Sequence, residues 1–252
     1  MSKFAVVTGS SGGIGSAIVD AFLSDKYHVV GIDSRCSRRN SALYVEIKAD
    51  LYEFAKNENY REKILNQIKN ILPEKLEDFV LINNAAVQIL NPVSESHWKH
   101  WDNTLNVNTV APFFLAQGFI SQLIEVQGHI VNISSIHSKL TKPNFSCYAA
   151  SKAALDSLTR SLALELSPKG ISVNAVSPAA IDTMMLQDGF RKAPDKLKEL
   201  ERYHPSGSIG TPKQLAALVK SITEQKGAFL TGSIIEFTGG ISGQLSDPDI
   251  LI

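Results

Sequence analysis

Short runs of β-branched and other apolar residues alternate along this chain with longer segments of helical periodicity. Runs that predict strands are Phe4–Val7, His28–Ile32, Leu43–Ile47, Phe79–Ile82, His129–Ile133, Ile171–Val176 and Ser233–Phe237. Segments that predict helices are Ile14–Leu23, Tyr60–Leu72, Trp98–Leu123, Ala149–Leu166 and Pro212–Thr223. This alternation is typical of βαβ units, in which helices cover both faces of a parallel sheet. The sequence therefore predicts an α/β fold with a doubly wound parallel sheet of about seven strands.

The length of the chain fits one domain of this class. Its 252 residues are 44% hydrophobic and 20% charged, which is ordinary for a globular protein. We therefore expect residues 1–252 to form a single domain. Residues 182–208 form a longer and more polar connection than the others, and a connection of that length is often a lid over a site. We expect a substrate lid in this segment.

Charge and cysteine usage exclude several classes of function. The 25 basic and 25 acidic residues give a formal net charge of zero, which argues against a nucleic-acid partner. Cys36 and Cys147 have no metal-ligand spacing, so we expect neither a disulfide nor a metal site. No apolar stretch has the length of a membrane span or a signal sequence. We expect a cytoplasmic protein with no membrane partner.

A glycine-rich segment, Thr8–Gly15, follows the first predicted strand and opens the first predicted helix. Glycines in such a turn let the backbone approach a pyrophosphate closely. The N-terminus of the following helix then attracts the anion. Ser16 and Ala17 follow Gly15 where a kinase-type P-loop needs Lys and Ser or Thr. The segment therefore predicts a dinucleotide site in a Rossmann-like sheet.

Asp33 ends the second predicted strand, eighteen residues after Gly15. An acid near this offset binds the adenosine ribose in dinucleotide-binding folds. A carboxylate accepts hydrogen bonds from the ribose and repels a 2′-phosphate, so we expect a preference for NAD(H). Arg35 lies close enough in sequence to leave NADP(H) possible, and an aspartate that only caps the loop is the alternative interpretation of Asp33.

Tyr-x-x-x-Lys occurs three times, as Tyr44/Lys48, Tyr52/Lys56 and Tyr148/Lys152. On a helix the spacing places an ammonium group beside a phenol, and a nearby cation favours the phenolate. The first pair lies in an alternating stretch, where the two residues are about 13 Å apart along a strand. The second could be helical, but nothing upstream of it resembles a group that polarises a substrate.

Only the third pair has a catalytic context. Tyr148 opens a long helical segment, and Ser134 and Ser135 follow the apolar strand that precedes it. Ligands bind at the carboxyl edge of open parallel sheets. We therefore expect Tyr148 and Lys152 to act together with Ser135.

With these residues assembled, the chain resembles the short-chain dehydrogenase/reductase family in its compact form. The resemblance rests on Thr8–Gly15, Asp50 after the third strand, Asn83–Ala86, Asn108, Ser135 thirteen residues before Tyr148, Lys152, Ser177–Ala180 and Thr238–Gly240. Ala86, Ala179 and Thr238 stand where the family usually has Gly, Gly and Asp. The residues expected to contact the cofactor are Thr8, Gly9, Ser11, Gly13, Ile14, Gly15, Asp33, Asp50, Leu51, Asn84, Ala85, Tyr148, Lys152, Pro178, Ile181 and Thr183.

The resemblance implies an oxidoreductase that transfers a hydride between a nicotinamide and an alcohol or carbonyl carbon. Ser135 would bind the substrate oxygen, and Tyr148 would be the general acid or base. Lys152 would hold the nicotinamide ribose and lower the pKa of Tyr148, while Asn108 would hold the water chain that relays protons. The family also implies a homo-oligomer, a tetramer or a dimer. We expect the apolar end of residues 245–252 to cover a neighbouring subunit.

Two residues are candidates for substrate contact. His137, two residues after Ser135, could line the pocket, and Met184 could contact the substrate or only pack in the lid. His97 and His100 have no further ligand at metal spacing. They instead indicate a helix start with buried tryptophans and exposed histidines.

The sequence thus predicts an NAD(P)(H)-dependent alcohol/carbonyl oxidoreductase that acts on a small molecule. The alternative is a dinucleotide-sensing regulator that keeps the fold without chemistry. The nature of the substrate stays open, because residues 87–93, 136–145 and 184–208 show the least regular patterns. Secondary alcohols, sugars, steroids and acyl-carrier thioesters all fit.

Overall fold

The strands of the computed structural model, which describes residues 2–35, 39–191 and 193–245, form one parallel sheet. Its strand order is β3-β2-β1-β4-β5-β6-β7. The strands are β1 (Ser2–Thr8), β2 (His28–Asp33), β3 (Tyr44–Lys48), β4 (Leu76–Asn83), β5 (His129–Ile133), β6 (Ser172–Pro178) and β7 (Ile234–Phe237). This seven-stranded parallel sheet confirms the predicted fold class. Strand order reverses between β1 and β4, the kind of switch point where such sheets bind ligands.

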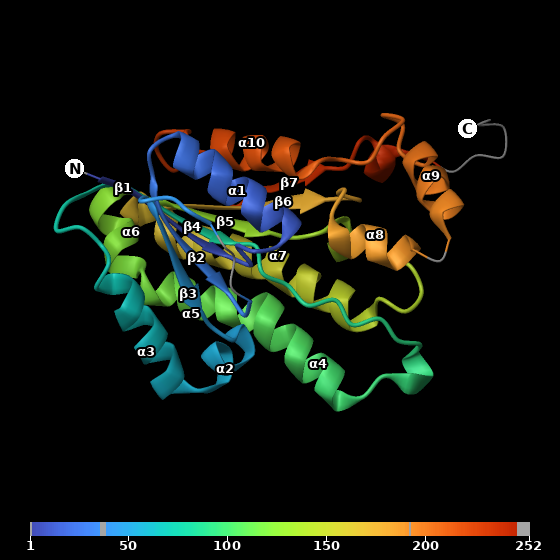
Figure 1. Cartoon of the computed structure of the whole chain (residues 1–252), viewed down its shortest axis with the longest axis horizontal. Helices are drawn as coiled ribbons and strands as arrows, with labels where there is room; N and C mark the ends of the chain where they lie inside the picture. Colours follow the sequence, from blue (N-terminus) through green and yellow to red (C-terminus); the bar gives the residue numbers. More distant parts are fainter. Residues whose placement is uncertain (1, 36–38, 192, 246–252) are drawn as a thin grey trace.

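Helices cover both faces of the sheet (Figure 1). One face carries α1 (Gly13–Ser24) and α10 (Pro212–Thr223). The opposite face carries α2 (Leu51–Lys56), α3 (Glu58–Lys69), α4 (Trp98–Leu105), α5 (Ala111–Gly118), α6 (Ile120–Val126) and α7 (Ser146–Leu166). Each layer buries its own apolar core, because parallel strands must be covered on both sides. Phe22 and Val219 are fully buried in the first core, and Phe54 and Phe119 in the second.

The register of the strands brings the predicted motifs to one edge. Thr8 pairs with Ile32, Asn83 with Asn132, and Ile133 with Val176. Because the strands are parallel, their carboxyl ends lie side by side. The residues that follow β1, β2, β4, β5 and β6 therefore meet at the same edge of the sheet.

The prediction of one continuous helix over Trp98–Leu123 is wrong. The structure has α4, a π-helical turn (Asn106–Val110), α5 and α6 in its place. Phe119 interrupts the helix with φ −109° and ψ 12°, and its ring packs at a tilt against Phe79 in the core, with 5.4 Å between centroids. The chain bends by 59° there. Local apolar periodicity does not reveal such breaks, because tertiary contacts cause them.

The connection 182–208 contains two helices, α8 (Met184–Phe190) and α9 (Pro194–Arg202). The side chain of Thr183 caps α8 by accepting the N–H of Leu186 at 3.3 Å. Both helices lie beyond the carboxyl ends of β6 and β7, at one end of the molecule (Figure 1). At the start of α10, Thr211 and Gln214 form a capping box.

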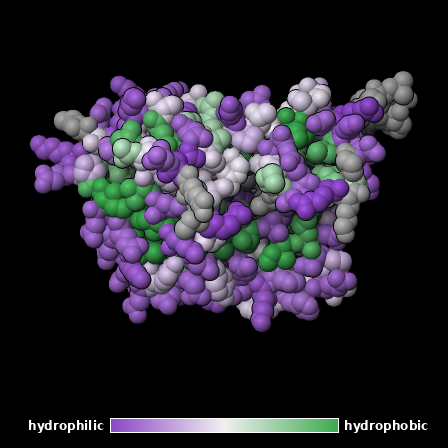
Figure 2. Space-filling model, in the orientation of Figure 1, coloured by the Kyte–Doolittle hydropathy of each residue, from purple (hydrophilic) through white to green (hydrophobic). Residues whose placement is uncertain are grey.

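The expectation of buried tryptophans and exposed histidines at the start of α4 is wrong for Trp98 and for His100. Trp98 is 76% exposed, because it opens α4 on the solvent side, whereas Trp101 is half-buried. His97 is exposed as expected, but His100 is half-buried, where its Nδ1 lies 3.1 Å from Asn91 Nδ2. On the face drawn in Figure 2, hydrophobic residues form separate groups among hydrophilic ones.

The described ranges bear on two kinds of partner, a metal ion and a membrane. No group of three His, Cys, Asp or Glu side chains that could hold a metal ion occurs within them. Within the same ranges no single helix is long and apolar enough to span a membrane, whereas the bent pair Trp98–Gly118 and Ile120–Val126 meets the length and composition test jointly. Cys36 and most of the C-terminal segment 245–252 lie outside the described residues.

Candidate active site

The turn after β1 has a backbone that requires glycine. Gly9 has a φ of +65°, a left-handed conformation that favours glycine. Its N–H donates to Ile32 at 2.8 Å, and its carbonyl accepts the N–H of Gly12 at 3.1 Å. A Cβ on Gly15 would collide with the carbonyl oxygen of Gly9. The first turn of α1 is thus pressed against the loop, as a phosphate cradle requires.

The segment after β4 is fastened to this turn. The hydroxyl of Thr8 accepts the backbone N–H groups of Asn84 and Ala85, both at 3.0 Å. The side-chain amide of Asn84 donates to the carbonyl oxygens of Thr8 and Gly9 at 2.9 and 3.2 Å. The two predicted cofactor motifs therefore meet at the switch point between β1 and β4.

Asp33 is 8% exposed at the end of β2. Its carboxylate accepts the N–H of Ser11 and the N–H of Arg35, both at 3.0 Å. The guanidinium of Arg35 is exposed, with its Nε 4.0 Å from the carboxylate. Asp33 therefore caps the loop. Its binding of ribose stays a prediction that the contacts permit, because each oxygen keeps a free lone pair.

Asp50 also has a structural contact of its own. Its side chain caps α2 by accepting the N–H of Tyr52 at 2.8 Å. The next residue, Leu51, is buried in the core of that face. The segment therefore lies at the sheet edge where the cofactor is expected, and its contact with adenine stays a prediction.

Ser135 and Tyr148 are joined by a side-chain hydrogen bond. Ser135 follows β5 and is 7% exposed, and Tyr148 lies in the first turn of α7. Burial raises the pKa of Tyr148 above its usual value, and the hydrogen bond from Ser135 lowers it in part. The phenol is therefore held in its protonated form and needs further positive charge to become a base.

Lys152 follows one turn later and is almost wholly buried, at 2% exposed. Its Nζ donates to the carbonyl oxygen of Ile133 at 2.7 Å and lies 5.8 Å from the centre of the Tyr148 ring. Burial lowers the pKa of Lys152 to about 8, and the carboxylate of Asp156 partly offsets this. Its effect on the tyrosine and its contact with a ribose stay predictions.

Asn108 lies in the π-helical turn and is 1% exposed. Its side chain accepts the N–H of Val87 at 2.8 Å and donates to the Val87 carbonyl at 2.9 Å. It also donates to the hydroxyl of Ser151 at 2.9 Å, which donates to the carbonyl of Tyr148 at 2.7 Å. Ser151 was missed from the sequence, because a serine inside a helix carries no signal of its own.

His137 lies beside the tyrosine. Its ring stacks on Phe145 with 4.2 Å between centroids and approaches Tyr148 edge-on at 5.9 Å. Its backbone N–H donates to the hydroxyl of Ser135 at 3.2 Å. Burial, together with the charge of Lys142, lowers the pKa of His137 to about 4. The ring is therefore neutral at physiological pH and forms part of an aromatic wall.

The segment after β6 returns to the glycine turn. Ile181 pairs with Gly210 in an isolated bridge. A Cβ on Gly13 would lie 3.0 Å from the Cγ2 of Thr183, so Thr183 contacts the start of α1. Pro178 ends β6, and Met184 is 68% exposed at the start of α8. Of the residues predicted on this segment, Thr183 therefore lies against the glycine turn, whereas Met184 faces solvent.

The other two Tyr-x-x-x-Lys pairs do not reach this site. Tyr44 lies in β3, where its hydroxyl donates to Ser10 at 3.3 Å. Tyr52 and Lys56 lie in α2 and are joined through a 3.0 Å hydrogen bond. The strand assignment of the first pair is confirmed, and the second pair is helical as the sequence allowed.

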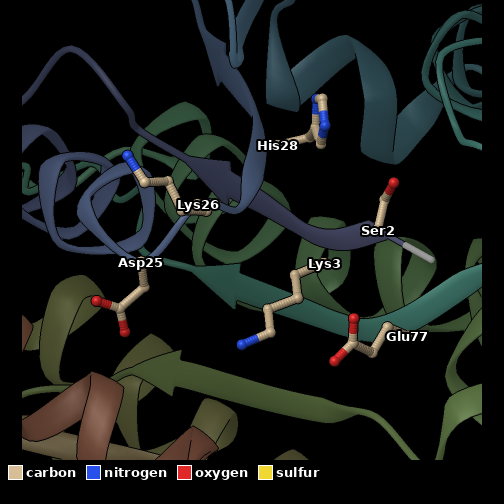
Figure 3. Close-up of a pocket in the computed structure, with 6 residues that line it drawn as sticks. All are labelled: Ser2, Lys3, Asp25, Lys26, His28 and Glu77. Carbon is tan, nitrogen blue, oxygen red and sulfur yellow. The ribbon is translucent and has the colours of Figure 1, made fainter.

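Two hollows have been located in the described part of the chain. The larger, of about 330 Å³, is lined by Ser2, Lys3, Asp25, Lys26, His28 and Glu77 at the amino ends of the strands. Figure 3 shows that these side chains do not converge, since His28 points away from Lys3 and Glu77. The smaller, of about 180 Å³, lies against Ile136 and Ser177. Only the smaller one borders the edge that carries Ser135.

Comparison with known proteins agrees with this geometry. The family model of the short chain dehydrogenases matches residues 3–194. An NAD-dependent glycerol dehydrogenase of Listeria innocua is 31% identical over 242 residues, which cover 94% of this chain and 93% of that protein. The structure of 4-hydroxyisoleucine dehydrogenase with NADH has a TM-score of 0.86 at 26% identity, covering 96% of this chain and all of the other. The structure of ElxO with NADP has a TM-score of 0.85 at 26% identity and covers 97% and 100%.

The matched residues contain the glycine turn, Asn108, Ser135, Tyr148 and Lys152. The match and the seven-stranded sheet describe the same architecture. This chain belongs to the short-chain dehydrogenase family.

Proposed function

We propose that the protein is an NAD(P)(H)-dependent oxidoreductase that interconverts an alcohol and a carbonyl, with Tyr148 as its general acid or base. The observation that carries the proposal is the Ser135–Tyr148 hydrogen bond beside the buried ammonium of Lys152. Burying a tyrosine next to a cation destabilises the fold, and such perturbed groups cluster at functional sites. This pair lies at the ligand-binding edge of a parallel sheet.

The residues of the cradle fit a dinucleotide. Gly9 and Gly15 leave room that a Cβ would fill, and α1 begins at the turn with free N–H groups. When bound, the nicotinamide supplies or accepts the hydride. We favour NAD(H), because the Asp33 carboxylate is placed to accept hydroxyl groups and repel a phosphate. The NAD-dependence of the glycerol dehydrogenase relative supports this choice, and the NADP in ElxO keeps NADP(H) possible.

Each side chain of the site has a separate role in the proposed reaction. Ser135 donates a hydrogen bond to the substrate oxygen and stabilises the charge that develops there. In reduction Tyr148 donates its proton to that oxygen as the carbon receives the hydride; in oxidation it accepts the proton. Lys152, when protonated, lowers the pKa of Tyr148 and holds the ribose. Asn108 holds the water that returns the proton to Tyr148.

The surroundings define where the substrate lies. His137 and Phe145 provide an aromatic wall beside the Tyr148 ring. Residues 182–208 act as a lid of the single domain, with Met184 on the α8 side of the entrance. The substrate is a small alcohol or carbonyl compound. We further propose a homo-oligomer, a tetramer or a dimer, as the working form.

Cofactor binding and turnover test this proposal separately. NADH and NADPH are titrated by the change in their fluorescence. Each oxidised form is then offered with glycerol, other polyols, aldoses and hydroxysteroids, and absorbance at the nicotinamide band is followed. The proposal predicts tighter NADH binding and turnover of at least one alcohol class. Tight NADH binding without turnover on any class would instead identify a dinucleotide sensor.

A further inference from the structure

A polar cluster joins α2 to α4 behind the catalytic asparagine. The Tyr52 hydroxyl donates to the Asp102 carboxylate at 2.6 Å, and Lys56 Nζ lies 3.1 Å from the same oxygen. The side-chain amide of Asn106 donates to the Asp102 carbonyl oxygen at 2.6 Å and to its carboxylate at 3.0 Å. We call Tyr52, Lys56, Asp102 and Asn106 the Asp102 cluster.

The cluster ends on the first residue of the π-helical turn Asn106–Val110. In this turn the N–H of Ala111 bonds to the carbonyl of Asn106, five residues back. Such widened turns are rare and occur mainly where a helix carries a functional group. Asn108 in this turn bonds to Val87 and Ser151. A group that holds Asn106, the first residue of the turn, therefore also holds the Asn108 side chain in position for these bonds.

The contacts of Asp102 need a carboxylate. The carboxylate accepts from the Tyr52 hydroxyl, the Lys56 ammonium and the Asn106 amide at once. The hydrogen bonds from Tyr52 and Lys56 lower the pKa of Asp102, which keeps it ionised near neutral pH. Hydrogen bonds to an ionised acceptor are shorter and stronger than neutral ones. Asp102 can therefore serve as the anchor of the cluster.

The same cluster begins next to the predicted adenine site. Tyr52 lies two residues after Asp50, whose carboxylate accepts the Tyr52 N–H. Contacts thus run from the end of β3, through Asp102 and the widened turn, to Asn108, and from Asn108 through Ser151 to Tyr148. Each link is a hydrogen bond or a pair of neighbouring residues in the helix.

We propose that the Asp102 cluster is a positioning device for proton transfer, which holds the widened turn so that Asn108 stays in contact with Val87 and Ser151. The inference rests on the proposed function of Tyr148 and Asn108. A cluster that merely staples α2 to α4 would stabilise the protein without acting through Asn108. The two cases predict different results for double variants. If the cluster acts through Asn108, removing Asp102 has no further effect on kcat once Asn108 is replaced.

The test uses Asp102→Ala and the milder Tyr52→Phe in the full-length protein, with Tyr27→Phe as the matched control. The Tyr27 hydroxyl also bonds to a carboxylate, that of Asp78, but at the opposite edge of the sheet. Hydrogen exchange is followed by mass spectrometry over residues 104–112 and over the strands. Turnover, KM for the cofactor and cofactor affinity are measured on the same preparations.

We expect Asp102→Ala to speed exchange of residues 106–111 and to lower kcat about tenfold while NADH affinity changes little. Tyr52→Phe shows the same pattern with a smaller effect, and Tyr27→Phe leaves exchange at 106–111 and kcat unchanged. The double variant Asp102→Ala/Asn108→Ala has the same kcat as Asn108→Ala alone, because both substitutions remove one function.

Unchanged exchange at residues 106–111 in both variants would overturn the proposal. So would effects of Asp102→Ala and Asn108→Ala on kcat that multiply in the double variant, since the cluster would then act independently of Asn108. If the wild-type protein shows no turnover with any substrate, the proposed function fails. The exchange measurement still decides whether the cluster holds the turn.

Discussion

The ammonium group of Lys152 donates a 2.7 Å hydrogen bond to the carbonyl oxygen of Ile133, the last residue of β5. This contact places a cation in the core, one helical turn after Tyr148 and beneath the strand end that carries Ser135. Burial lowers the pKa of this ammonium to about 8. Because burying this charge is unfavourable, Lys152 affects the free energy of unfolding and its pH dependence, in addition to its proposed role in catalysis.

Lys152→Met is expected to raise the stability at pH 7 and to flatten its dependence on pH above 8. The folded protein loses the Lys152 proton near pH 8, whereas the unfolded chain keeps it to about 10.4. Between these values the unfolded state binds more protons, so the stability of the wild type rises with pH. This rise is at most about 3 kcal/mol. Urea unfolding at pH 7, 9 and 10 measures it, with Lys169→Met as an exposed control; equal slopes in wild type and Lys152→Met would contradict the account.

Ser135→Ala should lower kcat/KM by about 10²- to 10³-fold, as expected when a hydrogen bond to a developing charge is lost. The same substitution removes the hydrogen bond that lowers the pKa of Tyr148, so the rise of the alcohol-oxidation rate with pH, which follows deprotonation of Tyr148, moves to higher pH. Ser134→Ala is the matched control, since no hydrogen-bond partner of the buried Ser134 hydroxyl is found among the described residues. A comparable loss in both variants would show that packing is responsible.

Asp33→Asn is expected to weaken NADH binding about tenfold while NADPH binding improves or stays constant. The amide removes the negative charge but keeps an oxygen that can accept the Ser11 N–H. The ratio of the two dissociation constants, measured by fluorescence titration, reports the change in preference. A wild-type protein that binds NADPH more tightly than NADH would overturn the role assigned to Asp33.

His137 should stay neutral through the working pH range. Its pKa of about 4 follows from burial and the nearby Lys142 charge, so protonation is complete only in acid. Two-dimensional NMR of the imidazole should show no titration between pH 6 and 8, while His97 serves as an exposed reference. Because the unfolded chain takes up this proton at about pH 6.5, His137 also reduces stability as the pH falls below that value. A midpoint above 6 would contradict the aromatic-wall interpretation.

Local sequence patterns predicted the elements whose causes are local. The strand His129–Ile133 and the helix Pro212–Thr223 match their predicted ends, because β-branched runs and a capping box act over a few residues. The glycine turn and the Ser135–Tyr148 spacing predicted that these residues meet at one edge of the sheet, as the strand register shows. These features depend on backbone conformation, which short motifs determine directly.

Features caused by distant residues were not predictable in this way. The break in Trp98–Leu123 depends on core packing of Phe119 and on the widened turn at Asn108. Tyr52 and Lys56 had no visible context, because their partner Asp102 lies fifty residues away from Tyr52 in the chain. The exposure of Trp98 likewise follows from where α4 begins on the folded molecule and not from its hydrophobicity.

The central claim is that the Tyr148 hydroxyl transfers the proton, and Tyr148→Phe tests it most directly. The phenyl ring keeps the packing against His137 and Phe145 but cannot exchange a proton. The measurement is single-turnover hydride transfer with NADH affinity determined in parallel. The account predicts unchanged NADH affinity and a rate lowered about 10²- to 10⁴-fold; near-normal hydride transfer by Tyr148→Phe would contradict it.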